Sequence, residues 1–268
     1  MCKNNFHKSP FMKKKYNIVY SLGRDCACAQ YMIKTNIRVS SGPFDWLTNA
    51  SFKERFDLLL SDFEGYFNKD DLVKMEKPKQ FPSDKQNDYY RNIKTNLFYW
   101  HDFPNNISFE KAYINIKNKY DRRIKRFYNN LKKEKNVLLI WYSQLDHTPD
   151  DQIIYLCDKF CKKIGKNIDF MIIEHVEGVD NIKSTKLKDN IIKYNLHARK
   201  EDVNGIPLTL GDEEKVLPLF QQISIDKKNL FKLKHNLLKF LVHFICIFIP
   251  YKKIRKEIRN KFLSNINI

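Results

Sequence analysis

The sequence predicts an α/β fold with three layers, in which an at least partly parallel sheet is flanked by helices. Two continuous apolar runs, residues 136–142 and 168–173, have the length and composition of strands buried on both faces. An amphipathic stretch between them, residues 151–164, has the apolar spacing of a helix. Strand, helix and strand at this spacing are typical of a βαβ unit, whose two strands run parallel.

Charge and composition divide the chain into three expected parts. Of the 268 residues, 49 are Lys or Arg and 31 are Asp or Glu, which gives a net charge of +18. We expect a basic N-terminal segment at residues 1–15, an α/β catalytic domain at residues 16–225 and a basic amphipathic tail at residues 226–268. The six cysteines are scattered, unlike a disulfide framework, and the N-terminal segment lacks the apolar core of a signal peptide. We therefore expect a cytoplasmic protein.

The domain is predicted to open with a strand, residues 18–20, that leads through Gly23 into a helix starting near Cys26. A thiol at a helix N-terminus lies at the positive end of the helix dipole, which favours the reactive thiolate. Asp25 has the chemistry of an N-cap, although its negative charge opposes ionisation of the thiol. The alternative is a structural role, since free cysteine is one of the most buried residue types.

The next segment places a carboxylate among aromatic residues. A turn at residues 40–43 precedes Asp45, which has an aromatic neighbour on each side. These neighbours are expected in the core, where a carboxylate needs a polar partner. A helix is predicted over residues 51–60, and residues 61–95 are expected to be irregular, because prolines interrupt a mixed sequence.

Three histidines follow strand-like segments and are candidate general bases. His101, next to Asp102, ends a short apolar run; His147 lies in the loop after the first buried run, and His175 follows the second. Open α/β sheets bind ligands at the carboxyl ends of parallel strands, where His147 and His175 are expected. Adjacent side chains of a strand point to opposite faces, so Asp102 adds little to the case for His101. A lone histidine is more often structural than catalytic.

The remaining elements carry weaker chemical signals. Residues 109–133 have the apolar spacing of one long helix, and residues 190–197 and 213–223 are predicted to form a strand and a helix. Four cations of the long helix either bind an anion or form a solvated face, which is the interpretation that we favour: Arg122, Arg123, Lys125 and Arg126.

Cofactor sites find no support in the sequence. With seven glycines in the whole chain and no glycine-rich loop, a dinucleotide-binding fingerprint is excluded. Cys26 and Cys28 lack a second pair at zinc-finger spacing. We expect neither a metal nor another cofactor.

The tail combines an apolar segment, residues 237–249, with a run of lysines and arginines after Pro250. This segment is too short for a bilayer span, which needs about 20 apolar residues. It suits an amphipathic helix in the membrane interface, with its cations at anionic headgroups. We expect residues 230–268 to bind an anionic surface, peripherally at the inner face of the plasma membrane; the alternative is a helix docked on the domain. No motif supports binding to nucleic acid.

Two motifs resemble a bacterial family of unknown function that is described as papain-like cysteine peptidases. The first is residues 21–26, SLGRDC, followed by Arg38 and by residues 41–47, SGPFDWL. The second and weaker motif is residues 101–103, HDF. The likeness covers roughly residues 16–225. The strand pattern is also similar to that of SGNH-like three-layer hydrolases, so the expected sheet is an SGNH-like or a papain-like variant.

The resemblance implies a catalytic role for several residues. The implied nucleophile is Cys26 and the implied base is His101, with Asp102 or Asp45 to orient the imidazole ring. Backbone N–H groups of the turn that contains Gly23 and Arg24 would bind the oxyanion.

The tail is similar to the C-terminal ends of bacterial enzymes that build lipooligosaccharide or capsule, which implies a glycan or glycolipid substrate. Our main expectation is a cysteine-dependent hydrolase or transferase of the acyl-transfer type. The alternatives are an enzyme of surface-polysaccharide biosynthesis and a non-catalytic, membrane-peripheral partner in that pathway.

Overall fold

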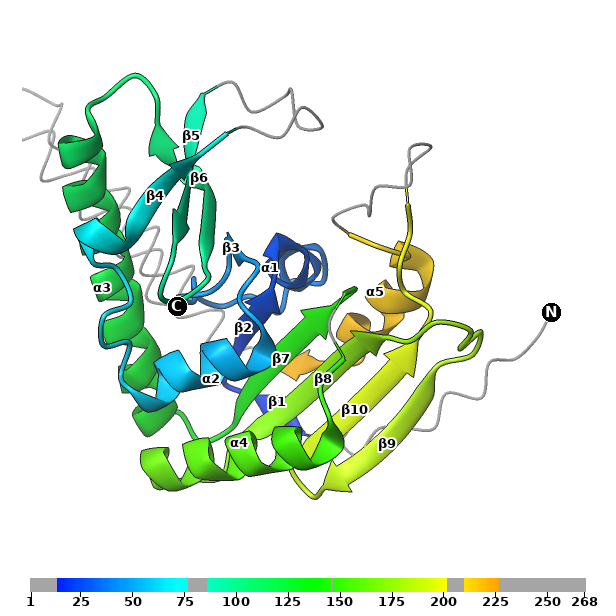
Figure 1. Cartoon of the computed structure of the whole chain (residues 1–268). Helices are drawn as coiled ribbons and strands as arrows, with labels where there is room; N and C mark the ends of the chain where they lie inside the picture. The colour runs from blue at the N-terminus through cyan, green and yellow to red at the C-terminus, as the bar shows by residue number, and fades with distance from the viewer. Residues whose placement is uncertain (1–13, 77–85, 146, 202–209, 227–268) are drawn as a thin grey trace, which may run out of the picture. The chain divides into compact units, whose positions relative to one another are not determined.

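The computed structural model describes residues 14–76, 86–145, 147–201 and 210–226 (Figure 1). The helices are α1 (Cys26–Lys34), α2 (Phe52–Leu60), α3 (Phe109–Lys133), α4 (Asp150–Ile164) and α5 (Glu213–Gln221). The strands are β1 (Lys15–Tyr16), β2 (Ile18–Arg24), β3 (Leu47–Thr48), β4 (Leu72–Met75), β5 (Asn87–Asn92), β6 (Phe98–Pro104), β7 (Val137–Ser143), β8 (Asp169–His175), β9 (Lys183–Lys188), β10 (Ile191–Leu196) and β11 (Ser224–Ile225). The fold is therefore mixed α/β, as the sequence predicts.

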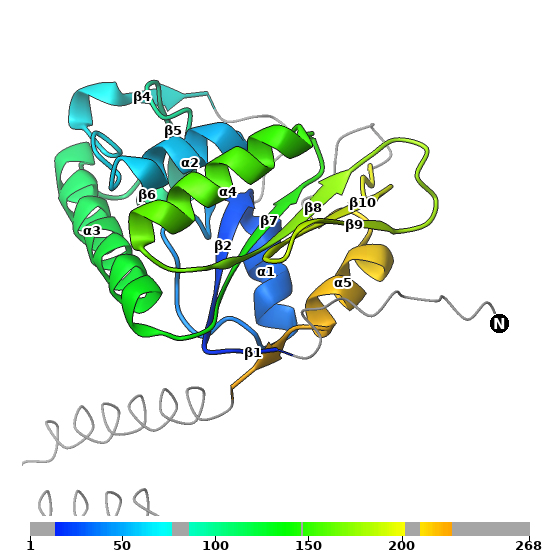
Figure 2. The same ribbon diagram turned by 90° about the horizontal axis from the view of Figure 1, so that it is seen from below.

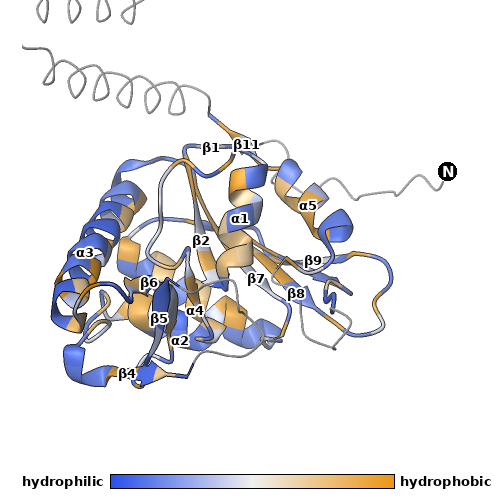
Figure 3. Cartoon of the chain, turned by 90° about the horizontal axis from the view of Figure 1, so that it is seen from above, coloured by the Kyte–Doolittle hydropathy of each residue, from blue (hydrophilic) through white to orange (hydrophobic). Residues whose placement is uncertain are grey.

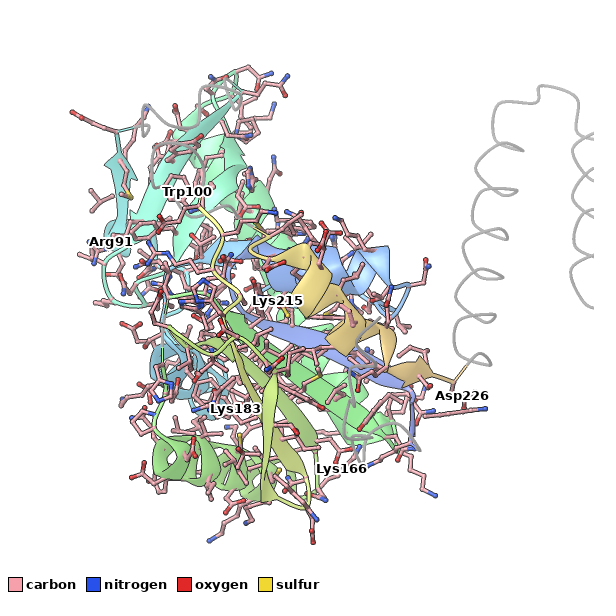
Figure 4. All side chains as sticks on the ribbon, turned by 90° about the vertical axis from the view of Figure 1, so that its right-hand side faces the viewer. Arg91, Trp100, Lys166, Lys183, Lys215 and Asp226 are labelled. Atoms are coloured by element: carbon pink, nitrogen blue, oxygen red, sulfur yellow. The ribbon has the colours of Figure 1, made fainter. Side chains whose placement is uncertain are left out.

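A five-stranded sheet in the order β2-β7-β8-β10-β9 forms the centre of the domain. The first four strands run parallel, and β9 is antiparallel to β10 at the edge. All of β7 and all of β8 except His175 are buried, which explains their continuous apolar runs. The unit β7-α4-β8 confirms the predicted βαβ crossover. The edge strand β9 is largely exposed and carries three lysines, among them Lys183 in Figure 4, which oppose edge-to-edge pairing.

Helices cover both faces of this sheet, as Figure 2 shows. On one face, the ring of Phe56 in α2 lies 6.1 Å from Phe160 of α4 and 6.0 Å from Phe170 of β8, between ring centroids. On the other face, Tyr31 of α1 stacks on Phe220 of α5 with a centroid distance of 5.2 Å. The helices thus flank the sheet as predicted, and aromatic contacts fix them to it and to each other.

A second sheet, in the order β3-β6-β5-β4, is antiparallel. Its strands β4 and β5 fall within residues 61–95, so the expectation of irregular chain is wrong for these strands. The strand signal is weak there because β4 has no buried residue and β5 is polar at both ends. Ring contacts join both this sheet and the turn after α2 to α3. The ring centroids are 5.1 Å apart for Tyr90 of β5 with Phe109 and 5.1 Å apart for Phe67 of the turn with Tyr113.

The helix α3 is one continuous element of 25 residues, as its apolar spacing predicts. Figure 3 shows α3 as a largely hydrophilic ribbon with hydrophobic patches. The buried residues of this helix include Ile116, Tyr120 and Phe127. Lys166, which follows α4 and is labelled in Figure 4, donates a hydrogen bond at 2.8 Å to the carbonyl oxygen of Leu131 in the last turn of α3. One face of α3 therefore packs on the domain while the other carries its charges.

The chain divides into two compact units, Met1–Ser224 and Ile225–Ile268. The predicted membrane-interface tail, residues 226–268, lies outside the described residues except for Asp226, and so does most of the predicted N-terminal segment 1–15. Both stay predictions. Among the helices that the structure describes, none has the length and apolar character to cross a membrane.

Candidate active site

Cys26 is the first residue of α1 and directly follows the parallel strand β2. The helix begins there because Asp25 caps it: the Asp25 backbone is extended, and its Oδ1 accepts a hydrogen bond from the Ala27 N–H at 2.9 Å. Cys26 therefore lies at the carboxyl edge of the large sheet, the edge at which open α/β sheets bind ligands. This is the strand-to-helix junction that the sequence predicts.

The surroundings of this thiol oppose its ionisation. Cys26 is only 8% exposed, and burial, followed by the charge of Asp25, raises the pKa of its thiol to about 12. Cys28 is fully buried, and burial raises the pKa of its thiol to about 12 as well. The expectation of a favoured thiolate is therefore wrong for the protein at rest.

A fully buried arginine holds the turn that precedes the thiol. Arg55 of α2 donates hydrogen bonds to the carbonyl oxygens of Leu22 at 2.9 Å, Leu47 at 2.9 Å, Ala50 at 3.0 Å and Arg24. These carbonyls belong to β2, to β3 and to the segment before α2, so one guanidinium joins the SLGRDC and SGPFDWL motifs. Arg55 was not predicted as a functional residue, although its position on the apolar face of the helix was a signal that it needs buried partners.

Gly23 is required by this arrangement. Its φ is +107°, which residues with a side chain rarely adopt, and a Cβ atom there would collide with the Arg55 guanidinium. The Gly23 N–H donates to Ser21 Oγ at 3.0 Å, so this amide is engaged within the turn. The first-turn N–H groups of α1, of which Asp25 occupies that of Ala27, are then the candidate oxyanion donors.

Asp45 is buried, and its partners come from its own loop. Its Oδ2 accepts hydrogen bonds from Arg38 Nε at 2.9 Å and from the Gly42 N–H at 3.0 Å. Burial raises the pKa of the Asp45 carboxyl group, against the opposing charge of Arg38. The polar partner that a carboxylate among aromatic residues needs is therefore Arg38.

His101 and Asp102 are neighbours on β6, but they differ in burial. His101 is exposed, whereas Asp102 is buried and accepts hydrogen bonds from the Tyr120 hydroxyl at 2.7 Å and from Lys119. Both partners belong to α3, so the carboxylate of Asp102 ties the small sheet to that helix.

His147 lies at the carboxyl edge of the large sheet, next to a buried ion pair that was not predicted from the sequence. Its Nδ1 is 3.3 Å from Oε2 of Glu174, and Lys193 Nζ lies 3.1 Å from the same oxygen. Glu174 and Lys193 are fully buried, and the carboxylate also accepts a hydrogen bond from the Thr148 N–H at 3.1 Å. This network fixes the loop between β7 and α4, where His147 stands.

His175 forms a cluster with Glu177 and His197, whose potential ligand atoms lie within 4.8 Å of one another. However, His175 Nδ1 accepts hydrogen bonds from the backbone N–H groups of Ala198 and Arg199, both at 3.1 Å. Its Nε2 then carries the ring proton and faces Glu177 at 3.1 Å. A metal-bound histidine instead donates its second N–H to a partner, so the hydrogen bonds of His175 do not fit a metal ligand.

The structure gathers the predicted residues into three groups. Cys26, Gly23 and Arg24 lie in the turn that Arg55 holds, and Asp45 lies near enough to act on the buried thiol of Cys28. The alternative bases His147 and His175 follow β7 and end β8 at the carboxyl edge. His101 and Asp102 belong to the small sheet.

Comparison with known proteins agrees with the motif resemblance. Residues 17–177, more than half of the chain, match the family described as "Putative papain-like cysteine peptidase (DUF1796)". The "Uncharacterized protein R408" of Acanthamoeba polyphaga mimivirus is 29% identical over 132 residues, which cover 45% of this chain and 59% of that protein. This relative is viral, and neither match supports the expected bacterial origin or the likeness of the tail to glycan-building enzymes. No solved structure matches the chain significantly.

Proposed function

Because the chain belongs to the family described as "Putative papain-like cysteine peptidase (DUF1796)", we propose that it is a cysteine-dependent hydrolase with Cys26 as the nucleophile. The position of Cys26 carries this proposal: it opens α1 directly after a parallel strand, in a turn that a buried arginine holds. The N–H groups and partial positive charge of the first helical turn support an oxyanion next to the sulfur atom.

In the proposed reaction, His101 accepts the thiol proton while the Cys26 sulfur attacks the carbonyl carbon of an ester or amide. The leaving group departs with that proton, and water then hydrolyses the thioester and restores the thiol. Because the pKa of the thiol is about 12, the sulfur needs a base during the attack itself. His147 and His175 are the alternative bases, and His175 would first have to release the Ala198 and Arg199 N–H groups from its Nδ1.

Hydrolysis of p-nitrophenyl acetate tests the nucleophile. We expect Cys26→Ala to lower kcat/KM by about 100-fold or more, because the variant lacks the sulfur atom on which the proposed thioester forms. Cys28→Ala is the matched control, since it removes a second buried thiol from the same helix, and it should keep most of the activity. Equal activity of Cys26→Ala and the wild-type chain would refute the proposal.

The same assay over a range of pH identifies the base. His101→Gln should lower kcat/KM by about 100-fold and remove the acidic limb of the pH profile, as loss of a general base does. His147→Gln and His175→Gln should keep the wild-type value of kcat/KM and the acidic limb of the pH profile. If one of these two variants shows the loss instead, the base is that histidine and not His101.

A further inference from the structure

Cationic side chains on the side of α3 that packs on the domain lie near the loop of residues 40–45. Of the four cations in the middle of this helix, Arg122 and Lys125 are exposed, as a solvated face requires, but Arg123 and Arg126 are half-buried. Arg123 Nη1 and Arg126 Nε are buried atoms that have no hydrogen-bond partner among the described residues. The interpretation of a solvated face is therefore wrong for this pair.

Three guanidinium groups converge on the loop. Arg126 Nη2 donates a hydrogen bond to the Ser41 carbonyl oxygen at 2.8 Å, and Arg38 Nη2 donates to Ser41 Oγ at 2.9 Å. The charge of Arg123 acts on the nearby Asp45 carboxyl group and opposes the rise of its pKa. The loop thus lies among cations from α3 and from the segment that follows α1.

The positive charge at this place exceeds the negative charge. Asp45 supplies one carboxylate, and its Oδ2 is shared between Arg38 and the Gly42 N–H. The Asp102 carboxylate near α3 is already bonded to Lys119 and Tyr120. Arg126 donates to the Ser41 carbonyl oxygen, and the Arg123 guanidinium lies 5.3 Å from the centroid of the Tyr120 ring, so neither cation has a carboxylate within ion-pair distance among the described residues. Removing part of a cation from water without such a partner is costly.

We propose that Arg38, Arg123 and Arg126, together with Ser41, bind a compact oxyanion, the phosphate or carboxylate group of a ligand. Guanidinium groups bind such anions through paired N–H donors, and the unpartnered nitrogens of Arg123 and Arg126 supply donors of this kind. Ser41 Oγ accepts from Arg38, which leaves its proton for the anion. The site does not involve the Cys26 thiol, and it stands whether or not Cys26 is a nucleophile.

Calorimetric titration of the full chain with inorganic phosphate, and separately with acetate, tests this site at constant ionic strength. We expect saturable binding of at least one anion, weakened about tenfold or more in Arg123→Gln and in Arg126→Gln, since each loses a charge-assisted hydrogen bond. Arg122→Gln and Lys125→Gln are matched controls, because each removes one charge from the exposed side of the same helix. Arg123→Lys keeps the charge and the fold but loses the paired donors, so it should also bind more weakly.

Two results would overturn the proposal. One is the absence of saturable binding of both anions by the wild-type chain. The other is an equal loss in all four neutralised variants, which would indicate general attraction by a basic helix. Binding of phosphate alone would assign the site to a phosphorylated ligand, and binding of acetate alone to a carboxylate.

Discussion

The reactivity of Cys26 is set by two opposed influences at the start of α1. The N–H groups of the first turn favour the thiolate, whereas burial and the Asp25 carboxylate favour the thiol, and the second pair is stronger. Asp25 takes part in both, because its side chain caps the helix while its charge acts on the sulfur. Helix position alone therefore does not make a cysteine reactive, and the proposed chemistry depends on a base.

Asp25→Asn separates these two roles. Asparagine caps a helix about as well as aspartate, so the fold should persist while the negative charge disappears. Burial is the larger cause of the raised pKa of Cys26, and the Asp25 charge adds to it. Removal of that charge should therefore lower the pKa in part and speed alkylation by iodoacetamide at pH 8 to 9, by about three- to tenfold. Asp57→Asn, on an exposed residue of α2, is the control. An unchanged rate in Asp25→Asn would show that its charge does not act on the thiol.

At the scale of elements, α2 is the connector between the motif segments. It begins with a capping box at Ser51 and Glu54, packs its aromatic side chains on α4, and carries Arg55 into the space between β2 and β3. The buried pair Glu174 and Lys193 has a similar role between β8, β10 and the start of α4. In both places a buried cation satisfies polar groups that belong to separate elements.

Arg55→Met tests this connection. It removes the Arg55 donors from three buried carbonyl oxygens and from the partly buried one of Arg24, so we expect the free energy of unfolding to fall by about 3–5 kcal/mol. The matched control is Lys53→Met, an exposed cation on the same helix, which should change it by less than about 0.5 kcal/mol. Urea denaturation measures both. Equal stability of the two variants would contradict the connecting role of Arg55.

At the scale of the whole molecule, local pattern predicted the elements that are buried and regular. The runs at residues 136–142 and 168–173 became β7 and β8 because strands buried on both faces leave a continuous apolar signature. β4 and β9 were missed because neither strand contains a buried residue. The Cys26 junction was predictable from strand, glycine and helix in succession. The partners of Arg55 were not, because they come from distant segments.

The membrane-binding role of the basic tail remains a proposal drawn from the sequence. We propose that residues 230–268 bind anionic lipid, with each cation near the surface contributing about 1 kcal/mol. Vesicles containing an anionic phospholipid should sediment the full chain but not a chain that ends at residue 229. Neutral vesicles are the control. Sedimentation of the shortened chain with anionic vesicles would contradict a role of the tail as the anchor.

The most direct test of the central claim is the identity of the acylated residue after rapid quenching with p-nitrophenyl acetate. Intact mass and peptide mapping should find one acetyl group on Cys26 in the wild-type chain and in Cys28→Ala, and none on the corresponding peptide of Cys26→Ala. Acetylation that persists unchanged in Cys26→Ala, or that maps to Cys28, would contradict the account and return Cys26 to the role of a buried structural cysteine.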